Sequence, residues 1–433
     1  MPPPASFREE RLHGGGQSDQ RTPGQRDRDR VLYCSAFRRL AGVTQVVGPV
    51  EGHIFHNRLT HTLEVAQIAR RLAEKFISSK DTSVQELVAA SGGIDPDVVE
   101  TAALVHDLGH PPFGHAGEAE LNKLVFEKKA TDGFEGNPQS FRIVTRLAAH
   151  RDSYQGLNLT RATLNAAIKY PYARKTRSIE VSKFGAYDSD SDAFAFARDG
   201  SVGEQKSIEG EIMDFADGVA YSVHDLDDFY RAGLIPLDRL LREKTDDFDR
   251  FVEEWSKDPR GVTAAEISAD KAFVRTWLGL SFGDVESRPT FKQHALLRTR
   301  TAALIGRFIT DVALVSRLTG GVTLHIPVQD RVLLRFCQRL VWYYVIDNPA
   351  LATQQYGQRR VVRSLFDVYV NATRKKKRNI IPPRYHAQLD AAADDAALVR
   401  LAADIIASFT DHQANLMFGR ITGASPGSVT GIL

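Results

Sequence analysis

Two cysteines, Cys34 and Cys337, are all that this chain of 433 residues contains. That number is too small for a disulfide-stabilised scaffold and fits a reducing compartment. No apolar run reaches the roughly 18–20 residues that a membrane-spanning helix requires. The N-terminal residues include no hydrophobic segment of the kind that forms a secretory signal. We therefore expect a soluble, cytoplasmic protein.

An excess of charge of one sign is also missing. The formal net charge is +2, which argues against a chain built mainly to hold nucleic acid. The basic residues nevertheless cluster at 21–39 and 374–378. Apolar residues at 42% and charged residues at 25% are ordinary globular values, so a sizeable core can form. The length suits one large helical domain or two to three ordinary ones.

Strand-like alternation and internal repeats are scarce, whereas helical periodicity is strong. Apolar residues recur every three to four positions from Leu59 to Phe76, and Asp95 followed by Pro96 is a helix start signal. We predict an all-α fold with at most a short β-hairpin, for which 43–56 is the candidate hairpin or loop. A functional loop is expected at 171–206. Further helices are expected at 28–41, 139–149, 161–169, from 207 onward, and at 262–280, 291–317, 328–346, 358–373 and 386–418.

The stretch ALVHDLGHPPFGHAGE, residues 103–118, stands out because it gathers histidines and carboxylates around a rigid turn. His106 and Asp107 lie side by side at the end of an apolar helical run. A break rich in glycine and proline follows, and then come His110, His115 and Glu118. Imidazole and carboxylate groups beside a rigid turn are typical of a metal-assisted hydrolase.

Four positions in three predicted helices form a candidate metal site: His61, His106, Asp107 and Asp217. Two imidazoles and two carboxylates suit a divalent cation such as Mn²⁺, Fe²⁺, Co²⁺, Ni²⁺ or Mg²⁺. Since no thiolate is present, a structural zinc site is disfavoured. Four protein ligands leave an open position for water or a phosphate oxygen. Taken singly, each residue is more often an ordinary core or solvated side chain, and only the combination favours a site.

The third of these helices carries a polar stripe beside its apolar face. Asp217, Tyr221 and Asp225 recur at spacings of four residues, so they share one side of the helix. Polar groups in that position are costly unless something satisfies them. A ligand site is the simplest explanation. Arg58, Lys169 and Lys183 are candidates to neutralise a bound phosphate, although the two lysines are equally consistent with a solvated loop.

Three strings carry a resemblance to a known family: HNRLTH (56–61), HDLGHPPFGHAGE (106–118) and DFADGVAYSVHDLDD (214–228). They resemble the ordered motifs of the HD-domain phosphohydrolases and, more narrowly, of the bacterial deoxyguanosine triphosphate triphosphohydrolase (dGTPase) group. The match covers about 21–230. It implies an HD-domain helical core over 26–235, after a mobile basic tail at 1–25. A C-terminal helical region at 236–420 and a frayed tail at 421–433 would follow.

The resemblance also implies roles for individual residues. The four candidate ligands, His61, His106, Asp107 and Asp217, match the metal ligands of the family. His115 and Glu118 match its proposed catalytic pair. The remaining matches are to groups around the substrate: Gln45 near sugar or base, Arg58 and His110 near phosphates, Tyr221 against the deoxyribose, and Asp225 as an acceptor for the 3′-hydroxyl. To these we add Lys183, from its charge, as a substrate-binding residue.

One position departs from the family pattern. The family often has Asp at position 218, and its animal relative has Lys, whereas this chain has Gly218. A secondary polar contact near the phosphates is therefore missing, which affects the expected affinity or nucleotide preference.

By resemblance, the expected activity is metal-dependent hydrolysis of dGTP, or of several dNTPs, at the α-phosphorus, releasing deoxynucleoside and tripolyphosphate. Mg²⁺ or Mn²⁺ is the first choice of cofactor, with Fe²⁺, Co²⁺ and Ni²⁺ as alternatives. Family members generally form hexamers or tetramers, sometimes with a nucleotide activator. We therefore expect a homo-oligomer, no membrane partner, and nucleic acid only as a secondary partner.

Two alternatives stay open. The nearest is another HD-domain enzyme, a nucleotidase or phosphodiesterase acting on a different nucleotide. The second is a nucleic-acid-binding regulatory protein with a vestigial site, for which the basic run 374–378 is the supporting feature. That run is better explained as a solvated helix end or an anion site at a subunit interface.

Overall fold

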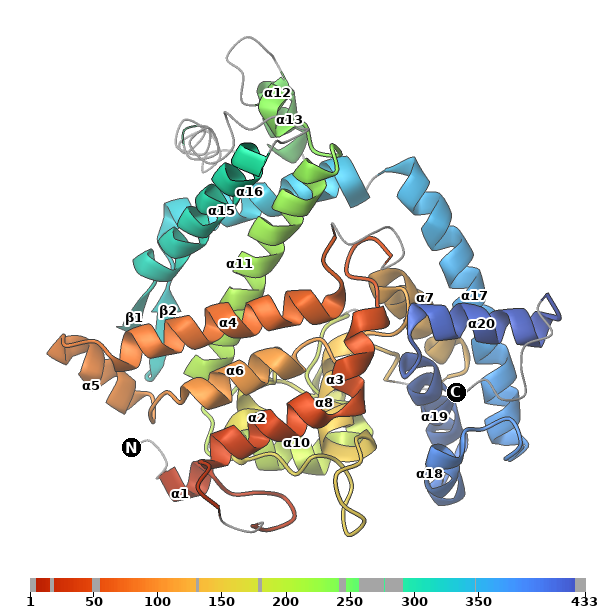
Figure 1. Cartoon of the computed structure of the whole chain (residues 1–433). Coiled ribbons are helices and arrows are strands. Elements are labelled where there is room, and N and C mark those ends of the chain that lie inside the picture. Colours follow the sequence, from red (N-terminus) through yellow and green to blue (C-terminus); the bar gives the residue numbers. More distant parts are fainter. Residues whose placement is uncertain are drawn as a thin grey trace.

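The computed structural model describes residues 5–15, 19–48, 55–129, 132–177, 181–240, 247–256, 276, 291–346 and 348–424. The predicted all-α fold is confirmed (Figure 1). Strands among the described residues are confined to one antiparallel hairpin, β1 (Ala313–Ser316) with β2 (Val322–His325). The hairpin therefore lies far from 43–56, where the described residues 43–48 and 55–57 form no strand. Within these ranges no helix has the length and apolarity needed to cross a membrane.

Three long helices make the core that supports the candidate site. They are α4 (Arg58–Ile77), α6 (Pro96–Val105) and α11 (Ile208–Arg231), and they pack against one another. Each begins at a side-chain cap, because Asn57, Asp95 and Ser207 accept hydrogen bonds from backbone N–H groups of the first turn. The caps fix where each helix begins. As a result, the first turn of α4, the end of α6 and the middle of α11 lie together.

Shorter elements surround this core. The predicted helix at 28–41 is divided, because Cys34 has extended backbone angles and both ends α2 (Pro23–Tyr33) and begins α3 (Ser35–Arg39). The expected loop at 171–206 contains a helix, α10 (Ser191–Arg198). The other elements of this region are α1 (Ala5–Arg8), η1 (Leu40–Gly42), α5 (Thr82–Ala90), α7 (Gly114–Glu127), α8 (Gly136–Arg142), η3 (Ile143–Leu147), α9 (Arg161–Ala166), η4 (Arg174–Thr176) and η5 (Asp188–Asp190).

The N-terminal residues differ from the expected mobile tail. Arg11 forms an ion pair of 2.6 Å with the fully buried Asp27, and Arg8 forms one of 2.6 Å with the buried Glu209. Thr22 caps α2 in a reciprocal capping box. The described residues 5–15 and 19–25 therefore lie against the core. The reason is electrostatic, since the two arginines compensate carboxylates that burial would otherwise leave unpaired.

The C-terminal helices cover the core from two sides (Figure 1). One set lies along α11: α15 (Phe291–Asp311), α16 (Val328–Val341) and the short η6 (Trp342–Ile346). The other set packs on α7 and forms a second hydrophobic cluster with it. It comprises α17 (Pro349–Arg374), η7 (Pro383–Tyr385), α18 (His386–Ala391), α19 (Asp395–Ala407) and α20 (Asp411–Thr422). Two short helices, α12 (Leu237–Leu240) and α13 (Asp247–Ser256), connect the regions.

Several boundaries in this half differ from the sequence prediction. The predicted helix 291–317 ends at Asp311, because residues 313–316 belong to the hairpin. The predicted helix 386–418 is divided into α18, α19 and α20. The predicted helix 262–280 lies outside the described residues, apart from residue 276. Of the frayed tail expected at 421–433, residues 421 and 422 belong to α20, and the residues beyond 424 lie outside the described part. The boundary expected near 235 stays a prediction.

Candidate functional site

A cavity of about 750 Å³ lies where α4, α6, α7 and α11 meet the C-terminal helices. All of the predicted site residues line it except Glu118 and Asp225. The lining residues that the sequence analysis selected are Gln45, Arg58, His61, His106, Asp107, His110, His115, Lys183, Asp217 and Tyr221. Residues from helices far apart in the sequence therefore line the same cavity.

The first histidine group consists of His61, His106 and Asp217. His61 Nε2 lies 3.1 Å from Asp217 Oδ1, and His106 Nε2 lies 3.6 Å from the same oxygen. One ligand atom from each residue lies within 4.8 Å of the others. Both histidines are buried. Three converging donor atoms in a buried setting are the arrangement that a bound cation requires.

The ring of His106 is oriented by the backbone. Its Nδ1 lies 2.6 Å from the carbonyl oxygen of Ala103, so Nδ1 donates this hydrogen bond and Nε2 is left for another partner. This Nε2 atom is buried and has no hydrogen-bond partner. Buried polar atoms are rarely left unpaired. A metal-ligating histidine is held in this way, by a hydrogen bond from its other ring nitrogen. The residues therefore fit a divalent cation.

Asp107 joins this group from the end of α6. Its Oδ1 lies 3.4 Å from His106 Nε2, and its Oδ2 accepts a hydrogen bond of 2.5 Å from the guanidinium of Arg58. Burial alone would raise the pKa of Asp107, but the positive charge of Arg58 beside it holds that pKa well below its usual range. Asp107 is thus ionised, and Arg58 is fixed facing the cavity.

A half-buried lysine neutralises the second carboxylate. Lys169 Nζ donates to Asp217 Oδ2 at 2.7 Å and lies 3.0 Å from Asp214. Burial would raise the pKa of Asp217, yet Lys169 and His106 hold it well below the usual value. Lys169 is therefore a paired cation of the cavity wall rather than a solvated loop residue. Beside it, a Cβ atom added to Gly218 would meet no atom within 4 Å, so the departure at this position leaves open space.

The second histidine group consists of His110, His115 and Glu118. His115 Nδ1 lies 2.8 Å from Glu118 Oε2, and Glu118 Oε1 accepts the N–H of Gly136 at 2.8 Å. Although burial opposes it, the hydrogen bond from His115 and nearby positive charge hold the pKa of Glu118 well below its usual range. The ionised Glu118 fixes the ring of His115, whose side chain is 72% exposed, and leaves its Nε2 available.

His110, a member of the second group, also lies next to the first group. Its Nδ1 is 3.1 Å from Asp107 Oδ1, and its ring is 5.1 Å from that of His115, edge to face. Burial lowers the pKa of His110 to about 4. At neutral pH this imidazole is therefore uncharged and suited to hydrogen bonding rather than to charge neutralisation.

Lys183 lies on the same side as the second group. Its ammonium is 2.6 Å from Glu135 Oε1 and 3.6 Å from Glu118 Oε1. Burial raises the pKa of Glu135 to about 7. Lys183 is thus a cation of the cavity wall that is held by carboxylates.

The polar stripe of α11 is divided by its surroundings. Tyr221 lines the cavity, but Asp225 does not. Asp225 is 3% exposed, its Oδ2 has no hydrogen-bond partner, and burial with the charge of Asp228 raises its pKa well above the usual value. The structure therefore does not bring Asp225 to the cavity, and its role towards a sugar hydroxyl stays a prediction.

The sequence analysis missed the contribution of the C-terminal helices. Polar residues of α17 line the cavity: Gln354, Gln355, Gln358 and Arg359. Trp342 and Ile346 add apolar surface, and Asn137 and Tyr170 also line it. Helical spacing of the four polar residues on α17 was the available signal. It was weak, because polar residues at such spacing usually face solvent.

Comparison with known proteins agrees with this site. The HD domain family matches residues 58–222, which span α4, α6 and most of α11, and a phosphohydrolase-associated domain matches 330–420. The helical fold, the buried histidine–aspartate group and these matches define the chain as an HD-domain phosphohydrolase.

Relatives that match most of the chain indicate a narrower family within the HD-domain phosphohydrolases. A deoxyguanosinetriphosphate triphosphohydrolase-like protein from Streptomyces coelicolor is 39% identical, with 93% of each chain covered. One from Corynebacterium efficiens is 34% identical over 94% of this chain and 93% of the relative. A deoxyguanosinetriphosphate triphosphohydrolase-like protein 2 from Vibrio cholerae is 32% identical, over 93% of this chain and 89% of the relative. The chain therefore belongs to the deoxyguanosinetriphosphate triphosphohydrolase-like family.

Proposed function

We propose that this protein is a metal-dependent dNTP triphosphohydrolase that cleaves dGTP, or several dNTPs, to deoxynucleoside and tripolyphosphate. The observation that carries the proposal is the buried His106 Nε2, unpaired beside two ionised carboxylates in a cavity rimmed by cations. The cavity volume of about 750 Å³ falls within the roughly 300–1,000 Å³ of small-molecule sites. The names of the relatives support a substrate of this class.

The metal would be held by His61, His106, Asp107 and Asp217. When bound, a divalent cation polarises a phosphoryl oxygen and lowers the pKa of a coordinated water. A donor set of imidazole and carboxylate without thiolate suits Mn²⁺, Fe²⁺, Co²⁺, Ni²⁺ or Mg²⁺, and the proposal takes Mg²⁺ and Mn²⁺ as the first candidates.

Cations fixed on the wall would bind the triphosphate. Arg58 is buried and held by Asp107 and by the carbonyl oxygen of Thr44, so little side-chain freedom is lost when it meets a phosphate. Lys169 and Lys183 are likewise held by carboxylates. Tyr221 would pack against the deoxyribose, where a 2′-hydroxyl would collide.

His115 would supply the proton for the leaving group. Hydrolysis at the α-phosphorus breaks the bond to the 5′-oxygen, which needs a proton as the deoxynucleoside departs. With Nδ1 bonded to Glu118, His115 can donate that proton from Nε2. Glu118 would keep the ring in place and stabilise its charged form, so it acts as a positioning group.

The product profile tests the proposal. Purified protein is incubated with each dNTP, alone and in pairs, with Mg²⁺ or Mn²⁺, and the products are separated. Deoxynucleoside and tripolyphosphate are expected. Formation of dNMP with pyrophosphate, or no product with any cation, would contradict the proposal.

The nucleic-acid alternative is less favoured. Within the basic run 374–378, Arg374 forms an ion pair of 2.6 Å with Asp395, and Arg378 forms one of 2.6 Å with Asp390. Their charges are thus partly compensated within the chain. Salt-dependent DNA retention without dNTP hydrolysis would reverse this ranking.

A further inference from the structure

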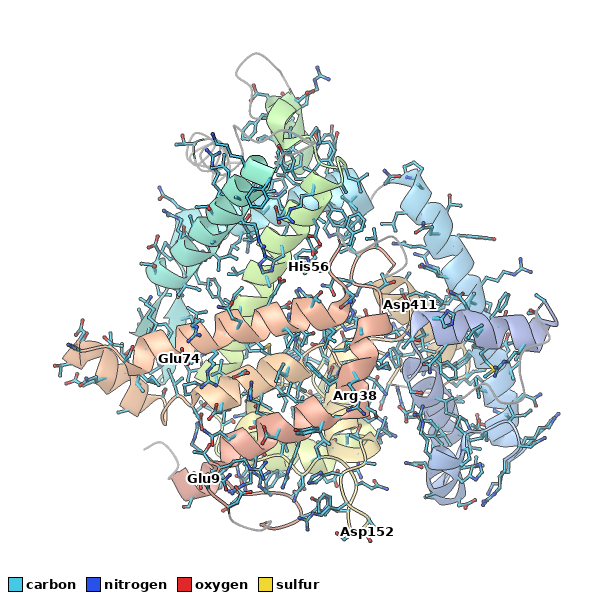
Figure 2. The ribbon with its side chains drawn as sticks, in the orientation of Figure 1. Glu9, Arg38, His56, Glu74, Asp152 and Asp411 are labelled. Atoms are coloured by element: carbon cyan, nitrogen blue, oxygen red, sulfur yellow. The ribbon has the colours of Figure 1, made fainter. Side chains whose placement is uncertain are left out.

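A buried carboxylate from the last described helix reaches two segments of the candidate site. Asp411 is the first residue of α20 (Figure 2) and is 9% exposed. Its Oδ2 accepts hydrogen bonds from the backbone N–H of Thr44 at 3.0 Å and from the Thr44 hydroxyl at 2.5 Å. Its Oδ1 accepts the backbone N–H of Phe113 at 2.7 Å. One side chain therefore joins segments that are about 70 residues apart in the sequence.

The first segment leads to the metal-facing wall. Thr44 precedes Gln45, and its carbonyl oxygen accepts a hydrogen bond of 3.1 Å from Arg58 Nε. Arg58 in turn donates to Asp107 at 2.5 Å. Because the N–H and hydroxyl of Thr44 are bound to Asp411 and its carbonyl to Arg58, the position of Arg58 depends on where Asp411 holds this segment.

The second segment leads to the second histidine group. Phe113 has a left-handed backbone with φ 67°, which is uncommon for a residue other than glycine. It immediately precedes α7, whose first two turns carry His115 and Glu118. Strained backbone of this kind persists only where surrounding contacts fix it. The hydrogen bond to Asp411 is such a contact.

The two segments also approach each other closely. A Cβ atom added to Gly114 would lie 3.0 Å from the carbonyl oxygen of Thr44 and 3.1 Å from Arg58 Nη2. A small shift of either segment therefore changes the spacing between Arg58 and α7.

The turn that carries Asp411 is itself fixed. The Arg39 guanidinium donates to the carbonyl oxygens of Phe409, Leu108 and His110, at 3.0, 2.7 and 2.8 Å. A Cβ atom on Gly42 would lie 2.8 Å from Thr410 Cγ2, so the chain passes this turn without spare room. The turn between α19 and α20 is thus held against the core by its own contacts, independently of the packing of these two helices.

We propose that Asp411 is a positioning residue of this hydrolase, which sets the distance between Arg58 and the His115–Glu118 pair through its three hydrogen bonds to Thr44 and Phe113. The inference rests on the proposed function. It extends the site to the C-terminal helices, which the HD motifs do not include. A carboxylate suits this role because both of its oxygens accept, whereas an amide presents one acceptor and one donor.

The test replaces Asp411 by Asn and uses Asp395→Asn as a matched control. Each aspartate is the first residue of its helix, but Asp395 is exposed and forms a surface ion pair of 2.6 Å with Arg374. Asp411→Asn keeps the side-chain volume and places an NH₂ group against one backbone N–H. We expect kcat to fall about ten- to hundredfold, as misplacement of catalytic groups does, and Asp395→Asn to stay within about twofold of the wild type.

Hydrogen–deuterium exchange supplies a readout that needs no turnover. Asp411→Asn should accelerate exchange of the amides at 43–45 and 113–118 while helical circular dichroism is retained, and Asp395→Asn should not. A purely structural role predicts a lower melting temperature with unchanged kcat for the folded protein. Unchanged kcat in folded Asp411→Asn overturns the proposal, as does unchanged exchange at both segments.

Thr44→Val is the second variant, for use where Asp411→Asn does not fold. It removes the hydroxyl and keeps both backbone hydrogen bonds, so a fall in kcat of about two- to fivefold is expected, with faster exchange at 43–45. Wild-type kcat and exchange in this variant would overturn the proposal. If wild-type protein hydrolyses no dNTP, the proposed function fails, whereas the exchange results still report whether Asp411 holds the two segments.

Discussion

The two histidine groups of the cavity contain the same kinds of residue in different surroundings. His61 and His106 of the first group are buried, and their partner carboxylate is neutralised by Lys169. His115 of the second group is 72% exposed and is held by the ionised Glu118. The first arrangement gathers two buried imidazole nitrogens and a carboxylate oxygen around one point. In the second, Nδ1 of His115 is bonded to Glu118 and Nε2 stays available.

The groups also differ in what supports them. The first is carried by α4, α6 and α11, which belong to the main hydrophobic core. In the second, His115 and Glu118 are carried by α7, whose apolar face packs with α17, α19 and α20 in the second cluster, and His110 lies in the turn before it. The two groups thus differ in burial and neighbouring charge rather than in residue type, and the proposed function gives metal binding to the first and proton transfer to the second.

The largest expected effect comes from removing a ligand of the first group. His61→Ala and Asp217→Ala should abolish turnover, a fall of roughly a thousandfold or more, and reduce bound Mn²⁺, because each deletes a donor atom. Circular dichroism should still report a helical protein. His325→Ala, at an exposed position on β2, is the control and should bind metal normally. Wild-type activity in either variant would remove that residue from the site.

The second group should respond differently to the same kind of substitution. His115→Ala should lower kcat by about 10²–10⁴-fold, the usual contribution of a general acid or base. Binding of Mn²⁺, measured by titration, should remain close to that of the wild type because His115 is not in the first group. Loss of metal together with activity would show that the two groups act as one.

A third effect concerns the stability of the wall that carries the first group. His56 Nδ1 lies 2.6 Å from Asp228 on α11, and His56 Nε2 lies 2.9 Å from Glu64 on α4 (Figure 2). Burial opposes protonation, yet these hydrogen bonds raise the pKa of His56 to about 10. Since the pKa of His56 in the folded protein exceeds the ordinary 6.5, its contribution to the free energy of unfolding is complete below about pH 6.5. This contribution is lost as pH rises towards 10.

Urea unfolding at pH 7 and pH 10 measures this contribution. The free energy of unfolding should fall by on the order of 1–3 kcal/mol more in the wild type than in His56→Gln over this interval. This range is lower than the full pKa shift would give, because solvent screens a partly exposed pair. Lysines and tyrosines that titrate in the same range cancel in the comparison. An equal loss in both proteins would exclude His56 as the group responsible.

The smallest effect is expected at Gly218. Gly218→Ala should stabilise the protein by about 0.5–1 kcal/mol, because alanine is the better helix former and the added Cβ meets no atom within 4 Å. The KM for dNTP should change little. Gly210→Ala on the same helix is the contrasting variant, since its Cβ would lie 3.1 Å from the carbonyl oxygen of Ala166. A gain in stability from both substitutions would contradict this explanation.

Much of the fold followed from local sequence. The apolar period of α4 and the start of α6 at Asp95 and Pro96 were predicted correctly, because caps and amphipathic spacing act within a few residues. The break at Cys34 and the end of α15 were missed. At Cys34 the apolar period continues across the break, and after Asp311 the strand forms only because β2 pairs with it.

The sequence alone determined the identity and order of the candidate groups, which are His61, the His106–Asp107 pair, His110 at the turn, His115 with Glu118, and then Asp217. Only the tertiary structure decided how each is used. The Lys169–Asp217 pair and the attachment of Asp411 to Thr44 and Phe113 join residues from different elements. Likewise, Tyr221 and Asp225 share one helical stripe, but only Tyr221 lines the cavity. Spacing fixes the face of a helix, whereas packing decides what each turn of that face meets.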